Sequence, residues 1–217
     1  MQSIYFVDSN FTYESSKKSI LSIRYATDGF SFCVHDETGK LVVFVHEPYA
    51  ADSREAAVAR LKNYVVNDAI LNLRFKKVYI MPCFKEKLLV PGAFFDKANI
   101  TTLYTVNQEV SPDDTILYHH IEGIEAYLVE TVISSFHDFV REHFPVFQIV
   151  NGAYPFILGA MGKALRDTEQ IFLDIQDNYF DLLFIRDSGI QLFNTFSYKA
   201  TTDIVYFLLN CIKECGI

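Results

Sequence analysis

Near its N-terminus the chain alternates apolar and polar residues with the period of a β-strand. Three such runs are rich in β-branched and aromatic residues and are joined by short polar turns: ILSIRY (20–25), FSFCVH (30–35) and LVVFVHE (41–47). Asp28-Gly29, in the first of these turns, is a tight-turn dipeptide because glycine adopts positive φ without a Cβ clash. The pattern predicts a three-stranded antiparallel meander.

The spacing of apolar residues then becomes helical. Asp52 or Ser53 can cap this helix, and the residues expected on its apolar face are Leu61, Val65, Ala69 and Leu73. A β-rich run, KVYIMP (77–82), follows. The first part of the chain therefore reads β-β-β-α-β, with the helix packed on a sheet.

Residues 84–121 are less regular and are interpreted as an inserted segment. Two prolines, a glycine and the acidic break SPDD predict a short strand, a short helix after Pro91, a loop, and a strand over 115–121. Regular alternation then returns, with a strand at 126–132, a helix at 133–144, a strand at 146–151 and a helix at 153–168.

The last part of the chain repeats the order of the first part. IFLDIQDNYFDLLFIR (171–186), the turn DSG, IQLFNTFSY (190–198) and a helix over 201–215 again read strand, turn, strand, turn, strand, helix. No strict sequence period accompanies this order. We expect two related lobes: residues 1–135, which carry the inserted segment around 84–121, and residues 136–217.

Composition and charge narrow the class of protein. With 50 % hydrophobic residues, the 217-residue chain can fill a sizeable core. Because 19 Lys and Arg face 27 Asp and Glu, the net charge of -8 argues against a nucleic-acid partner. The four cysteines form no CxxC pair and are expected to be reduced thiols. There is no signal-peptide pattern and no apolar run of the ~18 residues that a membrane span needs, so we predict a cytoplasmic protein.

Two stretches resemble a bacterial family of unknown function that is assigned to the actin-like ATPase fold. They are FVDSNFTYESSKKSILSIRYATDGFSFCVHDETGKL and FKEKLLVPGAFFD. The order of elements is also similar to that of the actin-like proteins of pilus assembly and secretion. The resemblance implies an α/β protein whose two ribonuclease-H-like lobes, each a mixed sheet with helices, flank a nucleotide cleft. Its motifs carry no known chemistry, so they indicate the fold rather than the function.

In working members of that fold, the first hairpin carries an aspartate that supports Mg²⁺ and a small-residue turn that wraps phosphate. The matching positions here are Arg24, Ala26 and Thr27. Only Thr27 has the residue type that the fold carries at its position. Arg24 places a cation where a metal-organising carboxylate belongs, and like charges repel. An arginine can instead contact phosphate oxygens directly, so Arg24 stays a candidate for an altered site.

The second hairpin of the fold is a glycine-rich turn between two aspartates. Here the aspartates match Asp174 and Asp181, but the residues between them include Gln176, Asp177 and Asn178 in place of glycine. Glycines are needed there because the backbone N–H groups must lie against phosphate oxygens, where a Cβ would intrude. The resemblance therefore implies a hairpin that has lost its phosphate-binding surface.

The remaining patterns supply no further site. His119 and His120 are adjacent in a predicted strand and point to opposite faces, so they cannot share a metal, and we predict neither a metal site nor a catalytic residue. The chain ends at Gly216-Ile217, where the fold normally continues into the strand that holds the adenosine. A second lobe shortened at its C-terminus and a shortened form of a longer protein both stay open.

Two functional hypotheses follow. The first is a non-catalytic scaffold without a cofactor, which binds an unknown protein partner or self-associates through the wide apolar arc of the helix over 201–215. The alternative is a divergent nucleotide-binding protein or slow ATPase that binds ATP and Mg²⁺ with an altered set of residues. Those residues are Arg24, Thr27, Asp174, Asn178 and Asp181. The changes at both hairpins weigh against the alternative.

Overall fold

A computed structural model describes residues 2–216. The chain divides into two compact units, each made of three chain segments. The first unit runs to Phe84 and includes Val110–Leu117 and Thr131–Gly152. The second comprises Lys85–Glu109, Tyr118–Glu130 and the chain from Ala153 onward.

The first unit contains a six-stranded sheet with the order β1-β4-β3-β2-β5-β9. Its strands are β1 (Ile4–Val7), β2 (Ile20–Ala26), β3 (Gly29–His35), β4 (Leu41–Pro48), β5 (Lys77–Pro82) and β9 (Phe147–Ile149). The pairs β1/β4, β4/β3 and β3/β2 are antiparallel, whereas β2/β5 and β5/β9 are parallel. The predicted meander and the strand that follows the helix are confirmed, and β1 extends the meander by a strand that the pattern did not predict.

Helices α1 (Tyr13–Ser16), α2 (Arg54–Asn67) and α4 (Ser134–His143) complete the first unit. Ser53 caps α2, and Leu61 and Val65 are buried on its inner face, as predicted. The helix ends earlier than the pattern indicated because the Asp68 carboxylate accepts hydrogen bonds from the backbone N–H of two following residues. Beyond that turn Leu71 is buried.

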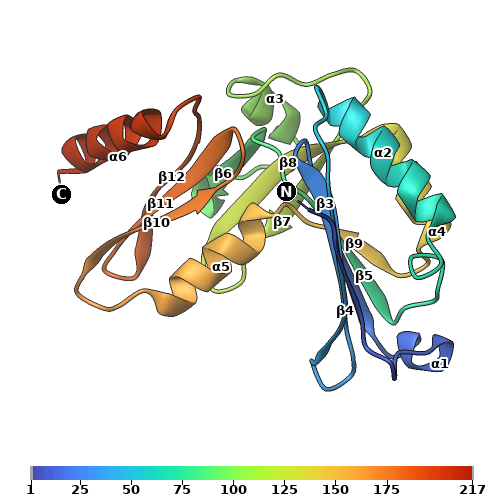
Figure 1. The fold of residues 1–217 in the computed structure, drawn as a ribbon. Helices are drawn as coiled ribbons and strands as arrows, with labels where there is room; N and C mark the ends of the chain where they lie inside the picture. Colours follow the sequence, from blue (N-terminus) through green and yellow to red (C-terminus); the bar gives the residue numbers. More distant parts are fainter. Residues whose placement is uncertain (1, 217) are drawn as a thin grey trace. The chain divides into compact units, whose positions relative to one another are not determined.

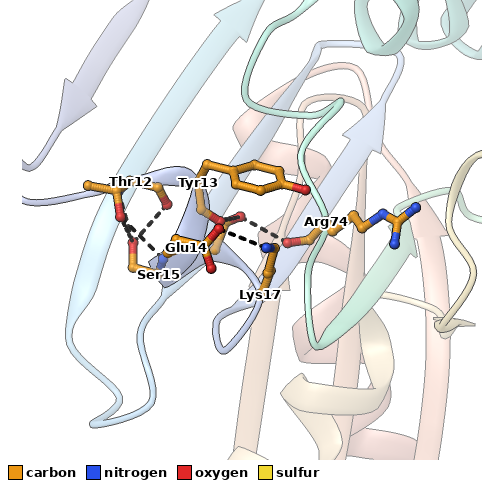
Figure 2. A network of polar contacts seen from close by, with 7 residues as sticks. Thr12, Tyr13, Glu14, Ser15, Lys17 and Arg74 are labelled. Atoms are coloured by element: carbon orange, nitrogen blue, oxygen red, sulfur yellow. Dashed lines mark hydrogen bonds and ion pairs between the residues drawn. The ribbon is translucent and has the colours of Figure 1, made fainter.

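A small polar network fixes the first turn of α1 (Figure 2). The Ser15 N–H donates to Thr12 Oγ1 at 3.2 Å, and the Thr12 N–H donates to Ser15 Oγ at 2.9 Å, which forms a capping box. The Ser16 hydroxyl is buried and donates to the Arg74 carbonyl oxygen at 2.9 Å. The segment before β2 is thereby attached to the segment before β5, and these two strands pair in parallel.

The second unit contains the sheet ordered β10-β11-β12 and most of a second three-stranded sheet, ordered β6-β8-β7. Their strands are β6 (Lys87–Pro91), β7 (Asp114–His120), β8 (Ala126–Ile133), β10 (Glu169–Ile175), β11 (Tyr179–Arg186) and β12 (Gly189–Ser197). The helical elements are the 3-10 turn Gly92–Phe94, α3 (Ile100–Thr105), α5 (Ala153–Lys163) and α6 (Thr201–Cys215). The chain passes from one unit to the other within β7 and again within β8.

Helices cover both faces of the β10-β11-β12 sheet, as Figure 1 shows. Leu183 and Ile185 of β11 pack toward α5, whereas Phe180 and Phe184 pack toward α6. Because both faces of β11 are covered, its side chains are buried without alternation. None of the helices within residues 2–216 is long and apolar enough to span a membrane.

The boundary between the units differs from the predicted boundary at residue 135. Helix α4 and strand β9 belong to the first unit, because β9 pairs with β5 and thereby extends the first sheet. Most of the segment around 84–121 belongs to the second unit and lies in the chain between two segments of the first. The repeated order is confirmed: β2, β3, β4 and α2 recur as β10, β11, β12 and α6, in separate sheets.

Candidate functional site

The second hairpin, β10 and β11 with the turn 176–178, keeps a closed turn that carries side chains where glycines were expected. The Gln176 N–H donates to the Tyr179 carbonyl oxygen at 2.9 Å. The Tyr198 hydroxyl donates to the Gln176 carbonyl oxygen at 2.6 Å, and the Tyr198 N–H donates to the Asn178 carbonyl oxygen at 3.0 Å. The Gln176 side-chain amide donates to Asp174 Oδ2 at 2.9 Å. Two carbonyl groups of the turn are therefore bound by Tyr198, just after β12, while the Gln176 side chain binds Asp174 of β10.

Asp181, the second of the two retained aspartates, is buried in an ion pair. Its Oδ1 lies 2.9 Å from Lys87 Nζ of β6, and only 1 % of the Lys87 side chain and 2 % of the Asp181 side chain are exposed. The Thr195 hydroxyl donates to the same oxygen at 2.6 Å, and Lys87 Nζ lies 4.6 Å from the centre of the Tyr179 ring. Burial raises the pKa of Asp181, while the Lys87 ammonium and the Thr195 hydroxyl act in the opposite direction.

A second buried acid lies across the strand pair from Lys87. Glu130 of β8 is opposite Lys87 in the β6/β8 register and is fully buried. His119 Nε2 of β7 lies 3.8 Å from Glu130 Oε1, and burial lowers the pKa of His119. Two carboxylates, one ammonium and one imidazole thus lie on strands of the two sheets of the second unit.

Sequence reasoning identified Asp181 but none of these polar neighbours. A signal was present, because Lys87 and Glu130 each stand within an apolar strand: KLLVP in β6 and AYLVETVI in β8. A charged residue in a buried strand requires a partner. Because each partner comes from a distant segment, no local spacing could pair Lys87 with Asp181.

The remaining predicted residues are divided between the two units. Arg24 and Thr27 belong to the first unit, and Asp174, Asn178 and Asp181 belong to the second. Within the second unit, Asp174 and Asp181 are directly opposite each other on β10 and β11, and Asn178 is exposed in the turn between those strands.

Arg24 has an acidic neighbour in its own hairpin. Its Nη1 lies 3.5 Å from Asp28 Oδ1, and each of the two side chains is 28 % exposed. Thr27 lies in the same turn, where its carbonyl oxygen accepts the Ala51 N–H at 2.8 Å. Arg24 and Thr27 therefore each contact other residues of the first unit.

The residues at these positions do not fit Mg²⁺ and a nucleotide phosphate. Mg²⁺ prefers oxygen ligands such as carboxylates, but Arg24 is a cation and Asp181 is bound to Lys87. The resemblance implies bare backbone facing a phosphate in this turn, where the chain carries Gln176, Asp177 and Asn178. Within residues 2–216, no group of three or more His, Cys, Asp or Glu side chains is placed to hold a metal ion.

A pocket of about 630 Å³ in the second unit lies beside the turn of this hairpin. It is lined by Lys85, Asn178, Ser197, Tyr198, Lys199, Asp203, Tyr206 and Phe207. The two lysines give it positive charge, and the aromatic rings give it flat apolar walls. Asp203 counters one of these charges; hydrogen bonds from the Lys199 and Ala200 N–H groups lower its pKa and keep it ionised. Such a pocket can accept a small aromatic anion.

Comparison with known proteins identifies relatives of the whole chain. A family model described as "Protein of unknown function (DUF3822)" matches residues 8–217. No curated protein sequence matches the chain.

Solved structures with a similar fold include the following two. One is a protein of unknown function with an actin-like ATPase fold from Bacteroides thetaiotaomicron VPI-5482, with a TM-score of 0.87 and 23 % identity, covering 95 % of this chain and 80 % of that one. The other is the PilM-PilN type IV pilus biogenesis complex, with a TM-score of 0.50 and 12 % identity, covering 82 % of this chain and 61 % of that one. The chain therefore has the actin-like ATPase fold, and at these identities the likeness concerns the fold alone.

Proposed function

The chain belongs to the DUF3822 family of proteins of unknown function, and we propose that it is a non-catalytic actin-like protein. In this proposal it acts as a protein-interaction scaffold without a cofactor. The observation that carries this proposal is the buried ion pair between Lys87 and Asp181. It engages Asp181, one of the two aspartates that this chain shares with the second hairpin of the fold. The hairpin then serves to join two sheets of the second unit.

Freeing Asp181 for a metal or its waters would be costly. The Lys87 ammonium would lose its contact with Asp181, and breaking one side of a buried pair costs about 3 to 5 kcal/mol. Binding Mg-ATP would have to supply this free energy in addition to its ordinary contacts. The pair therefore favours a state in which the hairpin binds no nucleotide.

The charge on the turn points in the same direction. Asp177 is exposed at its tip, and Asp174 lies at the end of β10 just before it. Both carboxylates would repel a triphosphate, and the net charge of -8 adds a general repulsion of polyanions.

Exposed apolar side chains on α6 support a protein partner or self-association. Val205, Tyr206 and Leu209 are at least half exposed and lie within one turn of each other. A protein complex of type IV pilus biogenesis has a similar fold. We place the scaffold in the cytoplasm, because its cysteines Cys33, Cys83, Cys211 and Cys215 are all free thiols, which suits a reducing compartment.

A divergent nucleotide-binding protein is the second candidate, and the pocket beside the hairpin favours it. Lys85 and Lys199 could contact phosphate oxygens, and Tyr206 could stack on a base. In that case, Asn178 is the residue of the predicted set that lines the pocket. This site would differ from the glycine-dependent phosphate site of the fold.

Thermal unfolding with Mg-ATP, together with an assay of ATP hydrolysis, separates the two candidates. A ligand at about 100 times its Kd stabilises a protein by ~2.7 kcal/mol, or about 5 to 10 °C for a chain of this size. We expect no shift with Mg-ATP, and hydrolysis equal to that of a mock preparation. A shift that Lys85→Ala with Lys199→Ala removes would support the second candidate. Turnover that Asp174→Asn abolishes, while the fold survives, would overturn the non-catalytic proposal.

A further inference from the structure

We propose that two copies of this chain pair in an antiparallel manner through the outer edge of β1, so that the six-stranded sheets of their first units join into one continuous sheet. The inference concerns the first unit alone, because β1 and its neighbour β4 both belong to that unit. It goes beyond the proposed scaffold function and does not depend on whether the second unit binds a nucleotide.

The outer edge of β1 has no neighbouring strand. β1 comes first in the sheet order, and within residues 2–216 it pairs with β4 alone. Ile4, Tyr5 and Phe6 are 50 %, 66 % and 46 % exposed. Because successive side chains of a strand point to opposite faces, these three residues are accessible on both faces of the sheet. An element lying along this edge would cover them, so their exposure indicates room for a further strand.

A hydrogen bond at the end of β1 shows which backbone groups face outward. The Asp8 N–H donates to the Val42 carbonyl oxygen at 2.8 Å, in continuation of the β1/β4 register. In an antiparallel pair only every second residue exchanges hydrogen bonds with the partner strand. The even-numbered residues of β1 therefore direct their backbone groups to β4. The alternation directs the N–H and C=O groups of Ser3, Tyr5 and Val7 to the open edge, where they form a template for another strand.

β1 lacks the features that usually protect an edge strand from pairing. Protected edges are very short or carry charges, prolines or bulges. Residues 2–7 include no charged residue and no proline, and the register with β4 is regular over Ile4–Val7. The opposite edge of the same sheet differs, because β9 is only three residues long and begins two residues after Pro145. One edge of this sheet is thus protected, whereas the other is available.

The residues of this edge favour a second copy as the added strand. A two-fold axis at Tyr5 places Tyr5 opposite Tyr5 of the second copy and Ser3 opposite Val7, so that every outward-facing residue has a partner. On the other face of the sheet, Ile4 then lies beside Phe6 of the second copy. An aromatic residue beside a β-branched residue is a favourable cross-strand pair. Since the stretch carries no charge, no like charges meet across the axis.

The position of Tyr5 at the axis allows a test that is specific to a second copy. Two ammonium groups would meet in Tyr5→Lys and two carboxylates in Tyr5→Glu, so each variant should weaken self-association by about tenfold. An equimolar mixture of the two variants should associate more strongly than either variant alone, because a lysine then faces a glutamate. Sedimentation velocity of the whole chain over a range of concentrations measures these effects.

Val66→Lys is the matched control. Val66 is 53 % exposed on α2 of the same unit, so this variant also replaces an exposed apolar side chain with lysine. Because Val66 lies on a helix rather than on the edge strand, the substitution should leave self-association unchanged. Circular dichroism of each variant verifies that the fold is retained.

Disulfide formation tests the register. Ile4→Cys and Phe6→Cys are prepared separately and then mixed in the presence of oxidised glutathione. Pairing about Tyr5 brings the α-carbon of residue 4 to about 4.5 Å from that of residue 6 in the second copy, a distance that a disulfide can span. Linked dimers should therefore form several times faster in the mixture than in either variant alone, where like positions are offset along the strands. The unmixed variants also control for the four native cysteines.

A single monomeric species at all concentrations would refute the inference, and so would a lysine–glutamate mixture that associates no better than its components. Equal rates of disulfide formation in mixed and unmixed samples would exclude pairing about Tyr5. Self-association that persists in Tyr5→Lys but is lost in Tyr206→Lys with Leu209→Lys would assign the contact to α6 and likewise overturn the inference. A Mg-ATP shift would remove the scaffold function and leave this inference standing.

Discussion

Lys87 Nζ and Asp181 Oδ1 lie 2.9 Å apart in the interior of the second unit and join β6 of one sheet to β11 of the other. The hydroxyl of Thr195 gives the carboxylate a further hydrogen bond at 2.6 Å. Two charges removed from water stabilise a protein only while each keeps its partner. This pair is therefore the point where the loss of one side chain should have the largest effect.

Lys87→Met should lower the free energy of unfolding by about 3 to 5 kcal/mol, because the Asp181 carboxylate stays buried without its cation. The double variant Lys87→Met with Asp181→Leu should lose much less than the sum of the two single variants. Urea unfolding of all four proteins measures both effects. Arg141→Met is the control for an exposed pair, since Arg141 contacts Asp138 at the surface, and it should cost less than ~1 kcal/mol.

The second prediction concerns His119, whose pKa is lowered by burial in the folded state. A group with a lowered folded pKa contributes stability that is complete above its unfolded pKa of about 6.5 and is lost as the pH falls through the folded pKa. Stability should therefore decrease between pH 7.5 and pH 5. In His119→Gln this component should be absent, and equal pH dependence of the two proteins would contradict the prediction.

Gly29 should be much less tolerant of alanine than Gly39. Gly29 has φ +150°, and an added Cβ would lie 2.7 Å from the Glu47 carbonyl oxygen of the neighbouring strand. Gly39 has φ +83° and no atom within 4 Å of such a Cβ. We expect Gly29→Ala to cost more than ~2 kcal/mol and Gly39→Ala about 1 kcal/mol. Thermal unfolding monitored by circular dichroism checks this order.

Tyr206 and Phe207 are neighbours on α6 with different roles. Tyr206 is 66 % exposed, whereas Phe207 stacks on Phe196 of β12 with ring centres 4.7 Å apart. Phe207→Ala should cost about 2 to 4 kcal/mol, because it leaves a cavity against the sheet. Tyr206→Ala should stay within about 0.5 kcal/mol. Chemical denaturation of the two variants checks the difference.

Self-association through α6 stays a prediction. Its test should use Tyr206→Lys with Leu209→Lys, since both residues are exposed, whereas charges at Phe207 and Leu208 would disturb packing on the sheet. We expect light scattering to show a lower mean mass for the double variant than for the native chain at high concentration. A native chain that is monomeric at every concentration would contradict self-association.

The elements with a clear local pattern could be predicted from the sequence. The boundaries of β5 and α6 agree with the prediction residue by residue, because turns or caps bracket each run. The predicted end of α2 was wrong because the Asp68 side chain stops the helix, although the helical spacing of apolar residues continues beyond it. Local patterns can indicate where an element lies, but a single hydrogen-bonding side chain decides where it stops.

What the sequence could not predict depends on contacts between distant segments. Assignment of β6 to the second unit follows from its pairing with β8 and from the Lys87 contact with Asp181. Neither contact produces a periodic pattern of residues in the sequence. For the same reason the resemblance identified Asp181 as a retained motif residue without revealing that Lys87 binds it. A motif records the identity of a residue, and its neighbours in space decide whether its charge is available.

The two units are interleaved along the chain, and this has a consequence for their synthesis. The first unit is completed by β9, whose last residue is Ile149, while β6 of the second unit has already been made by that point. A ribosome must therefore release segments of both units before either core can close, in contrast to proteins whose domains fold one after the other. No single cut between β1 and β12 divides the chain into two fragments that each carry one complete unit.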